Sequence, residues 1–201
     1  MQGKRMYVHD NPRRLCLKKA NPNLFTRVNE LKNARLPEGE HWAGFGNLFL
    51  LDKPDLMAVQ VSRRATDIEI VAMKAKVIER IETGAVVVSP FISAGEKEIA
   101  RLVMAQGDGG VILLKPDGFP PLYKPSGKYF DLCAQGRLLV LSAFPYTGHI
   151  IWRFISSSLS FKRTISSADF CGMLIIPQYL HWSTCRLRST SIGAPHEGQF
   201  I

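Results

Sequence analysis

The sequence predicts an α/β protein: a three-layer, Rossmann-like domain with a parallel sheet, preceded by a partial helical, basic N-terminal segment and followed by an irregular tail. Between residues 56 and 142, short apolar runs alternate with amphipathic segments that have helical spacing. Strands separated by helices pair in parallel, because the connecting segment crosses over the sheet. With 46% hydrophobic residues, the chain has enough apolar material for a packed core.

The alternation starts after a polar, basic region and can be followed residue by residue. The expected elements are, in order, a strand over 56–62, a helix after Thr66, a strand over 85–88, a helix after Ser93, a strand over 111–114, a short helix over 129–135 and a strand over 138–141. Each strand run is short and each helical run is bounded by a capping residue or a glycine. The segment from Gly44 to Leu51 is expected to be a strand or a hairpin arm leading into this unit, with Gly44 and Gly46 allowing close packing against the sheet.

Two capping boxes mark the starts of the two longer helices. Thr66 stands three residues before Glu69, and Ser93 stands three residues before Glu96. Gly84 is expected to end the first helix in a left-handed conformation. The apolar positions expected to form its buried face are Ile68, Val71, Ala72, Ala75 and Ile78.

The chain is expected to divide into three parts. Residues 1–50 form the basic segment, residues 51–147 the Rossmann-like domain, and residues 148–201 an atypical, serine-rich tail that is irregular or derives from a change of reading frame. The 26 Lys and Arg residues outnumber the 17 acids mainly at the ends, because residues 51–150 hold twelve cations against eleven acids. Contact with a polyanion is therefore expected at the ends of the chain.

Several classes of protein are disfavoured by composition. No apolar run approaches the length of a membrane span, and the N-terminus carries charges where a signal peptide would be apolar, so we expect a cytoplasmic protein without a membrane partner. The four cysteines show no C-x-x-C spacing and are expected to be free thiols, and no metal site is expected.

In Rossmann-like sheets, ligands bind beyond the carboxyl ends of the strands, which here are followed by Arg63 and Arg64, by Ser93 and by the Lys115 loop. Ser93 and Gly95 open a helix directly after a strand, where free backbone N–H groups can bind a phosphate. The alternative is that Ser93 only caps its helix and Gly95 only allows close packing, because neither strong nucleotide fingerprint is present. Both interpretations remain open at this stage.

The N-terminal segment contains Tyr7, then Asn11-Pro12, then four cations within seven residues: Arg13, Arg14, Lys18 and Lys19. Since Pro12 disfavours helix at the preceding residue, a helix carrying Tyr7 is expected to end at Asn11. The four cations predict contacts with several DNA phosphates, and a solvated basic face is the alternative.

The string from Tyr7 to Leu15, YVHDNPRRL, resembles the tyrosine-bearing helix and Asn-Pro end of REP-associated tyrosine transposases, single-strand DNA enzymes of the HUH class. The strings VSPFISAGEK, from Val88, and FDLCAQGRLL, from Phe130, resemble an extension after the transposase-like domain that looks like the Rossmann-type fold of the DNA-processing protein A family. The resemblance covers roughly residues 6–146. It implies that Tyr7 stands at the position of the family's DNA nucleophile and that the partner is single-stranded or hairpin DNA.

Two departures from the family limit what the resemblance implies. HUH chemistry uses Mg²⁺ or Mn²⁺ held by a His-x-His pair, and none of the five histidines forms such a pair, so the residues for this cofactor would lie upstream of Met1. The resemblance also stops at Tyr146. We therefore expect a DNA-binding, transposase-related protein without autonomous strand cleavage, and a homo-oligomer is a candidate assembly. The alternatives are a stand-alone Rossmann-like module that binds a nucleotide or a nucleic-acid phosphate, and a non-functional remnant.

Overall fold

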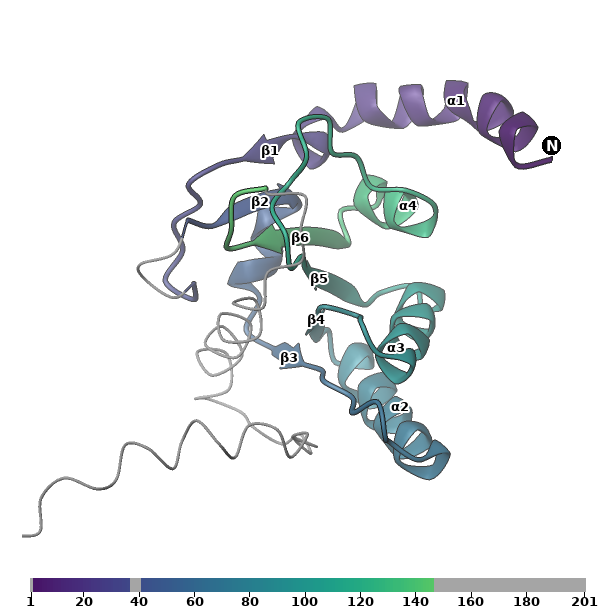
Figure 1. Ribbon diagram of the computed structural model, residues 1–201, viewed down its shortest axis with the longest axis vertical. Coiled ribbons are helices and arrows are strands. Elements are labelled where there is room, and N and C mark those ends of the chain that lie inside the picture. Colours follow the sequence, from purple (N-terminus) through teal and green to yellow (C-terminus); the bar gives the residue numbers. More distant parts are fainter. Residues whose placement is uncertain (1, 37–40, 147–201) are drawn as a thin grey trace, which may run out of the picture.

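A computed structural model describes residues 2–36 and 41–146, with side chains from Val8 onward (Figure 1). The predicted tail, residues 148–201, lies outside the described residues. A mixed six-stranded sheet forms the centre of the molecule, in the order β1-β2-β6-β5-β4-β3. The α/β class predicted from the sequence is confirmed.

Four strands form the parallel part of the sheet, and the helices α2 to α4 connect them. These strands are β3 (Leu56–Ala58), β4 (Val86–Ser89), β5 (Gly110–Leu114) and β6 (Leu138–Ser142). The connecting helices are α2 (Asp67–Glu82), α3 (Ala94–Ala105) and α4 (Lys128–Ala134). The predicted elements of this region are therefore all present, although β3 is shorter than the expected strand over 56–62. Beyond β3, the N–H of Val59 still donates to the carbonyl of Val88 at 2.9 Å, whereas the N–H of Val61 donates to the carboxylate of Glu96 at 3.1 Å.

Two antiparallel strands extend the predicted parallel sheet at one side. Strand β2 (Ala43–Gly46) pairs antiparallel with β6, and β1 (Arg27–Val28) pairs antiparallel with β2. Gly46 makes the close pairing possible: its φ is +114°, and a Cβ there would lie 2.3 Å from the carbonyl oxygen of Leu138. Both strands come from the segment before residue 51, so the sheet extends across the predicted boundary between residues 1–50 and 51–147.

The chain turns sharply after β2. Asn47 caps the following 3₁₀ helix, η2 (Leu48–Asp52), by accepting the N–H of Phe49, and its amide donates to the carbonyl of Gly136 at 2.7 Å. The expected strand or hairpin arm from Gly44 to Leu51 is thus a strand only as far as Gly46. A Cβ on Gly44 would lie 3.0 Å from a methyl group of Leu48, so this glycine does serve close packing.

Both predicted capping boxes are present. In α2, Thr66 and Glu69 exchange hydrogen bonds between side chain and backbone, and Ser93 and Glu96 do the same in α3. Gly84 follows α2 with a φ of +90°, as expected for a left-handed residue after a helix.

The predicted buried face of α2 is wrong. Ile68 is 82% exposed and Val71 is 63% exposed, whereas Val77 and Ile81 are buried against the sheet. Helix α2 has apolar side chains on two opposite faces, so periodicity alone does not decide which one is buried. The face that also includes Ile70 packs on the core, and the other is left open to solvent.

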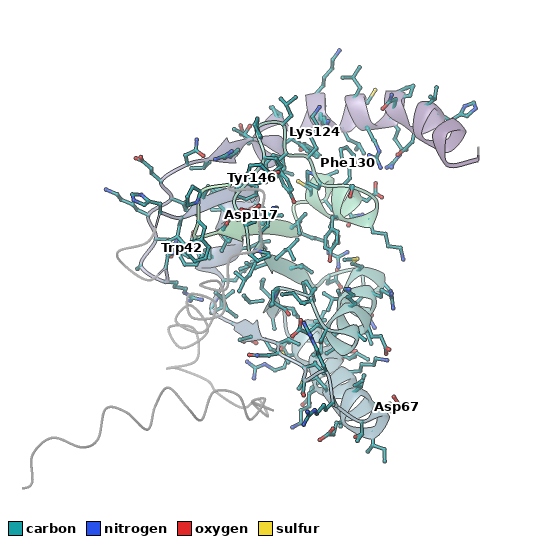
Figure 2. The ribbon with its side chains drawn as sticks, in the orientation of Figure 1. Trp42, Asp67, Asp117, Lys124, Phe130 and Tyr146 are labelled. Carbon is teal, nitrogen blue, oxygen red and sulfur yellow. The ribbon has the colours of Figure 1, made fainter. Side chains whose placement is uncertain are left out.

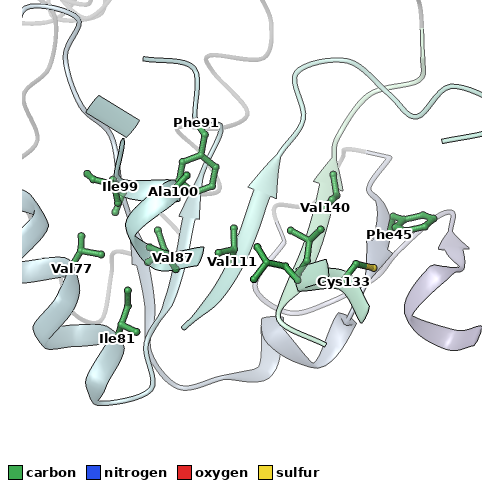
Figure 3. Close-up of a cluster of buried hydrophobic side chains, with 14 of the residues drawn as sticks. Phe45, Val77, Ile81, Val87, Phe91, Ile99, Ala100, Val111, Cys133 and Val140 are labelled. Carbon is green, nitrogen blue, oxygen red and sulfur yellow. The ribbon is translucent and has the colours of Figure 1, made fainter. Parts of the chain in front are cut away.

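Two clusters of buried side chains lie on the two faces of the sheet. The pairing register places Met57, Val87, Val111 and Leu138 in one row across the parallel strands. These residues belong to the cluster formed with α2, α3 and α4 (Figure 3). The opposite cluster includes Val88, Ile112 and Leu139 together with Leu50 and Leu51 of η2. Within the described residues, all three crossover helices contribute to the first cluster, so a third layer of α-helices is not found there.

Candidate nucleic-acid interface

Helix α1 (Gln2–Ala20) carries the basic N-terminal segment, and it runs through Pro12 without a break. The prediction that a helix would end at Asn11 is therefore wrong. Pro12 removes one backbone hydrogen bond, but Asp10 bridges the site by pairing with Arg13 at 2.6 Å and with Arg14 at 2.6 Å. The two hydrogen-bonded guanidinium groups lower the pKa of Asp10 to about 2.

Arg13 and Arg14 also attach α1 to the body of the protein through α4. Arg13 pairs with Asp131 at 2.8 Å, and the guanidinium of Arg14 lies 4.6 Å from the centroid of the Phe130 ring. Hydrogen bonds with Asp10 and Asp131 raise the pKa of Arg13. Figure 1 shows that the N-terminal half of α1 extends beyond α4. Both predicted DNA-contacting arginines therefore have partners within the protein.

Lys18 lies in a group of positive charges. Its ammonium is 5.6 Å from the centroid of Phe130 and 5.9 Å from that of Phe25, and the two rings are 5.0 Å apart. Desolvation, together with the positive charges of Lys124 and Arg14, lowers the pKa of Lys18. Figure 2 shows Lys124 and Phe130 close to α1. We call Arg14, Lys18 and Lys124 the basic cluster.

The basic cluster is only partly neutralised by the protein. Arg14 pairs with Asp10, but no carboxylate in residues 8–36 and 41–146 forms an ion pair with Lys18 or Lys124. Lys124 is exposed, and so is Lys19, which follows Lys18 in the sequence. Like charges held together raise the local positive potential, which favours an anion at this surface.

Lys124 links the basic cluster to the carboxyl edge of the sheet. It belongs to the loop of residues 115–127, which starts where β5 ends. Lys115 holds the start of this loop by donating to the carbonyls of Asp117 at 3.1 Å and Gly118 at 2.8 Å. A Cβ on Gly118 would lie 2.2 Å from the backbone nitrogen of Tyr146, so the loop packs tightly on the segment that follows β6.

The carboxyl edge presents apolar side chains as well as cations. Ile92 after β4 is 47% exposed, Leu122 after β5 is 85% exposed, and Tyr146 after β6 is 48% exposed. Arg63 and Arg64, after β3, are exposed too. Each loop that leaves this edge thus offers a cation or an apolar side chain to a ligand.

The start of α3 agrees with the alternative interpretation, in which Ser93 caps the helix and Gly95 allows close packing. Ser93 accepts the N–H of Glu96 and caps the helix, while a Cβ on Gly95 would lie 2.7 Å from a methyl group of Val61. The buried carboxylate of Glu96 accepts the backbone N–H groups of Ile92 and Ser93. Capping and close packing therefore account for both residues, and the phosphate site at Ser93 and Gly95 stays a prediction.

Tyr7 lies in α1, on the same continuous helix as the four cations. Within the described residues, no group of three or more His, Cys, Asp or Glu side chains is placed to hold a metal ion. No helix in that part of the chain is long and apolar enough to cross a membrane. The role of Tyr7 stays a prediction.

The sequence reasoning missed the residues that dock α1. Asp10 was detectable, because an acid three and four residues before two arginines forms ion pairs on a helix. Asp131 lies 118 residues from Arg13, and no local pattern pairs them. Lys124 was visible only as one of several lysines in a long loop.

The sequence matches no family model, and no curated protein matches it at a significant level. Among solved structures, the chain is similar to DNA processing protein A from Helicobacter pylori, which is described as having a unique single-stranded DNA binding mode. The two share 21% sequence identity with a TM-score of 0.49 over 70% of this chain. The match spans 65% of the length of that protein.

Proposed function

We propose that this protein binds single-stranded nucleic acid, with DNA as the expected partner. The observation that carries the proposal is the approach of Lys124, from the carboxyl-edge loop, to Lys18 of α1 with no carboxylate of the described residues paired to either. In this proposal, phosphates contact Lys18, Lys19 and Lys124. Arg13 and Arg14 orient α1 and contact phosphate at its exposed side.

The exposed side chains at the carboxyl edge favour single-stranded nucleic acid over a duplex as the ligand. Unstacked bases can contact apolar side chains, whereas the bases of a duplex are stacked on one another. Ile92, Leu122 and Tyr146 are exposed beside the cations of this edge. Arg63 and Arg64 extend the positive surface to the far side of the sheet.

A titration of labelled oligo-deoxythymidine, followed by fluorescence anisotropy at several salt concentrations, tests the proposal. The double variant Lys18→Ala/Lys124→Ala removes two proposed phosphate contacts. We expect roughly tenfold weaker binding, and a slope of log K against log salt that is smaller by about 1.4, from ~0.7 per contact. Binding that prefers duplex DNA of the same length would contradict the single-strand assignment.

A matched control separates this site from general attraction by the net charge. Lys53→Ala/Lys76→Ala removes the same charge from two exposed lysines that lie outside the basic cluster. We expect this control to keep nearly all of the affinity. Equal losses in both double variants would mean that the net charge, not the basic cluster, attracts the nucleic acid.

The relation to REP-associated tyrosine transposases is the finer part of the proposal, and the resemblance around Tyr7 and Asn11-Pro12 supports it. Without the family's His-x-His pair, Tyr7 lacks the metal that would activate the scissile phosphate. We expect no covalent adduct at Tyr7 when the protein is incubated with single-stranded DNA and Mg²⁺. An adduct that is seen by denaturing electrophoresis and lost in Tyr7→Phe would show that catalysis persists.

A further inference from the structure

The exposed face of α2 carries an apolar stripe that the fold does not use. Ile68, Val71, Ala72 and Ala75 follow helical spacing of three and four residues, so they lie on one face. All four are exposed, Ile68 to 82% and Val71 to 63%, because the opposite face packs on the sheet. We call these four residues the α2 stripe.

We propose that the α2 stripe is a dimer interface, in which α2 of a second copy of this chain packs antiparallel about a two-fold axis between Val71 and Ala72. The proposal does not rest on nucleic-acid binding, and Arg64 is the one residue that it shares with the positive surface described above. A two-fold contact brings the same surface of both copies together, so the stripe must be complementary to itself.

The shape of the stripe meets this requirement. With the axis between Val71 and Ala72, Ile68 of one copy stands opposite Ala75 of the other, and Val71 stands opposite Ala72. Each large side chain therefore meets a small one at both ends of the contact. The small side chain of each pair leaves room for the larger one, so the two helices can approach closely.

The charges beside the stripe are complementary in the same arrangement. Glu79 lies one turn beyond Ala75 on the stripe face, and Arg64 lies two residues before the helix cap Thr66. The axis that aligns the apolar residues places Glu79 of one copy beside the start of α2 in the other, where the turn before the helix carries Arg64. Both side chains are exposed, and neither forms an ion pair with another described residue. A parallel arrangement would place Glu79 beside Glu79.

The size of the stripe predicts a weak dimer. Stable interfaces bury about 800 Å² on each partner, and one helix face with four apolar side chains offers less than that. We therefore expect a dissociation constant in the micromolar range, ~10⁻⁵ M, with monomer and dimer exchanging as the concentration changes. Such an equilibrium is visible only in a concentration series.

Sedimentation equilibrium of the full chain over a wide concentration series tests the proposal. We expect the mass to rise from one chain toward two. Ala72→Glu places a charge against Val71 of the second copy and should weaken association roughly tenfold or more. Ala94→Glu makes the same change at an exposed position of α3, outside the α2 stripe, and should leave association unchanged. Because Glu is a good helix former, both variants should keep the wild-type circular dichroism spectrum.

A charge exchange distinguishes the antiparallel arrangement from any other use of this face. Glu79→Arg and Arg64→Glu should each weaken the dimer, because each places like charges opposite one another at both ends. The double variant restores opposite charges and should recover association. A wild-type chain that stays monomeric at every concentration, a dimer indifferent to Ala72→Glu, or a double variant no better than the singles would each overturn the proposal.

Discussion

The sheet and helix α1 are held in the molecule by different forces. Ile112 and Leu139 in the sheet are completely buried among apolar side chains, and burial of that kind involves no charge that salt could screen or pH could titrate. Helix α1 is attached by ion pairs and by cations that lie over the ring of Phe130. Contacts of the second kind are screened by salt and weakened when a carboxylate is protonated. The part of the protein that offers cations to a polyanion is thus also the part that solution conditions can loosen.

The largest effect is expected in the sheet. Ile112→Ala should lower the free energy of unfolding by about 2–5 kcal/mol, because it removes buried methyl groups and leaves a cavity in the cluster that includes Leu50 and Leu51 of η2. Ile68→Ala makes the same change at a residue that is 82% exposed and should alter stability by less than about 0.5 kcal/mol. Urea denaturation of both variants checks the difference. Similar losses in the two variants would mean that Ile68 is covered in solution.

An intermediate loss of stability is expected when the buried carboxylate of Glu96 is replaced. The carboxylate of Glu96 is buried and accepts three backbone N–H groups, from Val61, Ile92 and Ser93. Glu96→Gln leaves one acceptor oxygen and places an amide among these donors, so we expect a loss of about 1–3 kcal/mol in a urea titration. Glu98→Gln is the control, since Glu98 is 42% exposed and pairs only with Lys74.

The features that were predicted from sequence are the local ones. The capping boxes at Thr66 and Ser93 were found because each involves residues three positions apart. The strands of the parallel region were found because each is a short apolar run between helical segments or turn signals. The antiparallel pairing of β2 with β6 joins residues about a hundred positions apart, and nothing near Phe45 or Val140 specifies it. The buried face of α2 was misjudged because both of its faces are apolar, and only packing against the sheet decides between them.

The candidate site also has a part that local sequence predicts and a part that depends on distant residues. The four cations of α1 were identified as a group, but their environments differ for reasons that lie elsewhere in the chain. Arg13 is neutralised by Asp131 of α4, whereas Lys18 meets the positive charge of Lys124. A cation's availability to DNA depends on these distant neighbours, so composition and spacing could identify the segment but not rank its residues.

The smallest effect is expected in the pH dependence of α1. The pKa of Asp10 is lowered from its usual value near 3.8 to about 2 by hydrogen bonds from Arg13 and Arg14. A depressed carboxylate pKa stabilises the helix above pH 4, and this contribution is lost as the pH falls from about 4 toward 2.

Amide hydrogen exchange of residues 8–20 should therefore accelerate over that pH range, after correction for the intrinsic rate, while amides of β5 remain protected. Asp10→Asn should show the loosened helix already at neutral pH and lose the pH dependence. If α1 and β5 instead lose protection together, the helix opens only with the whole domain. The basic cluster would then be a rigid part of the fold, and the contrast between the two regions would be one of composition without a consequence for their stability.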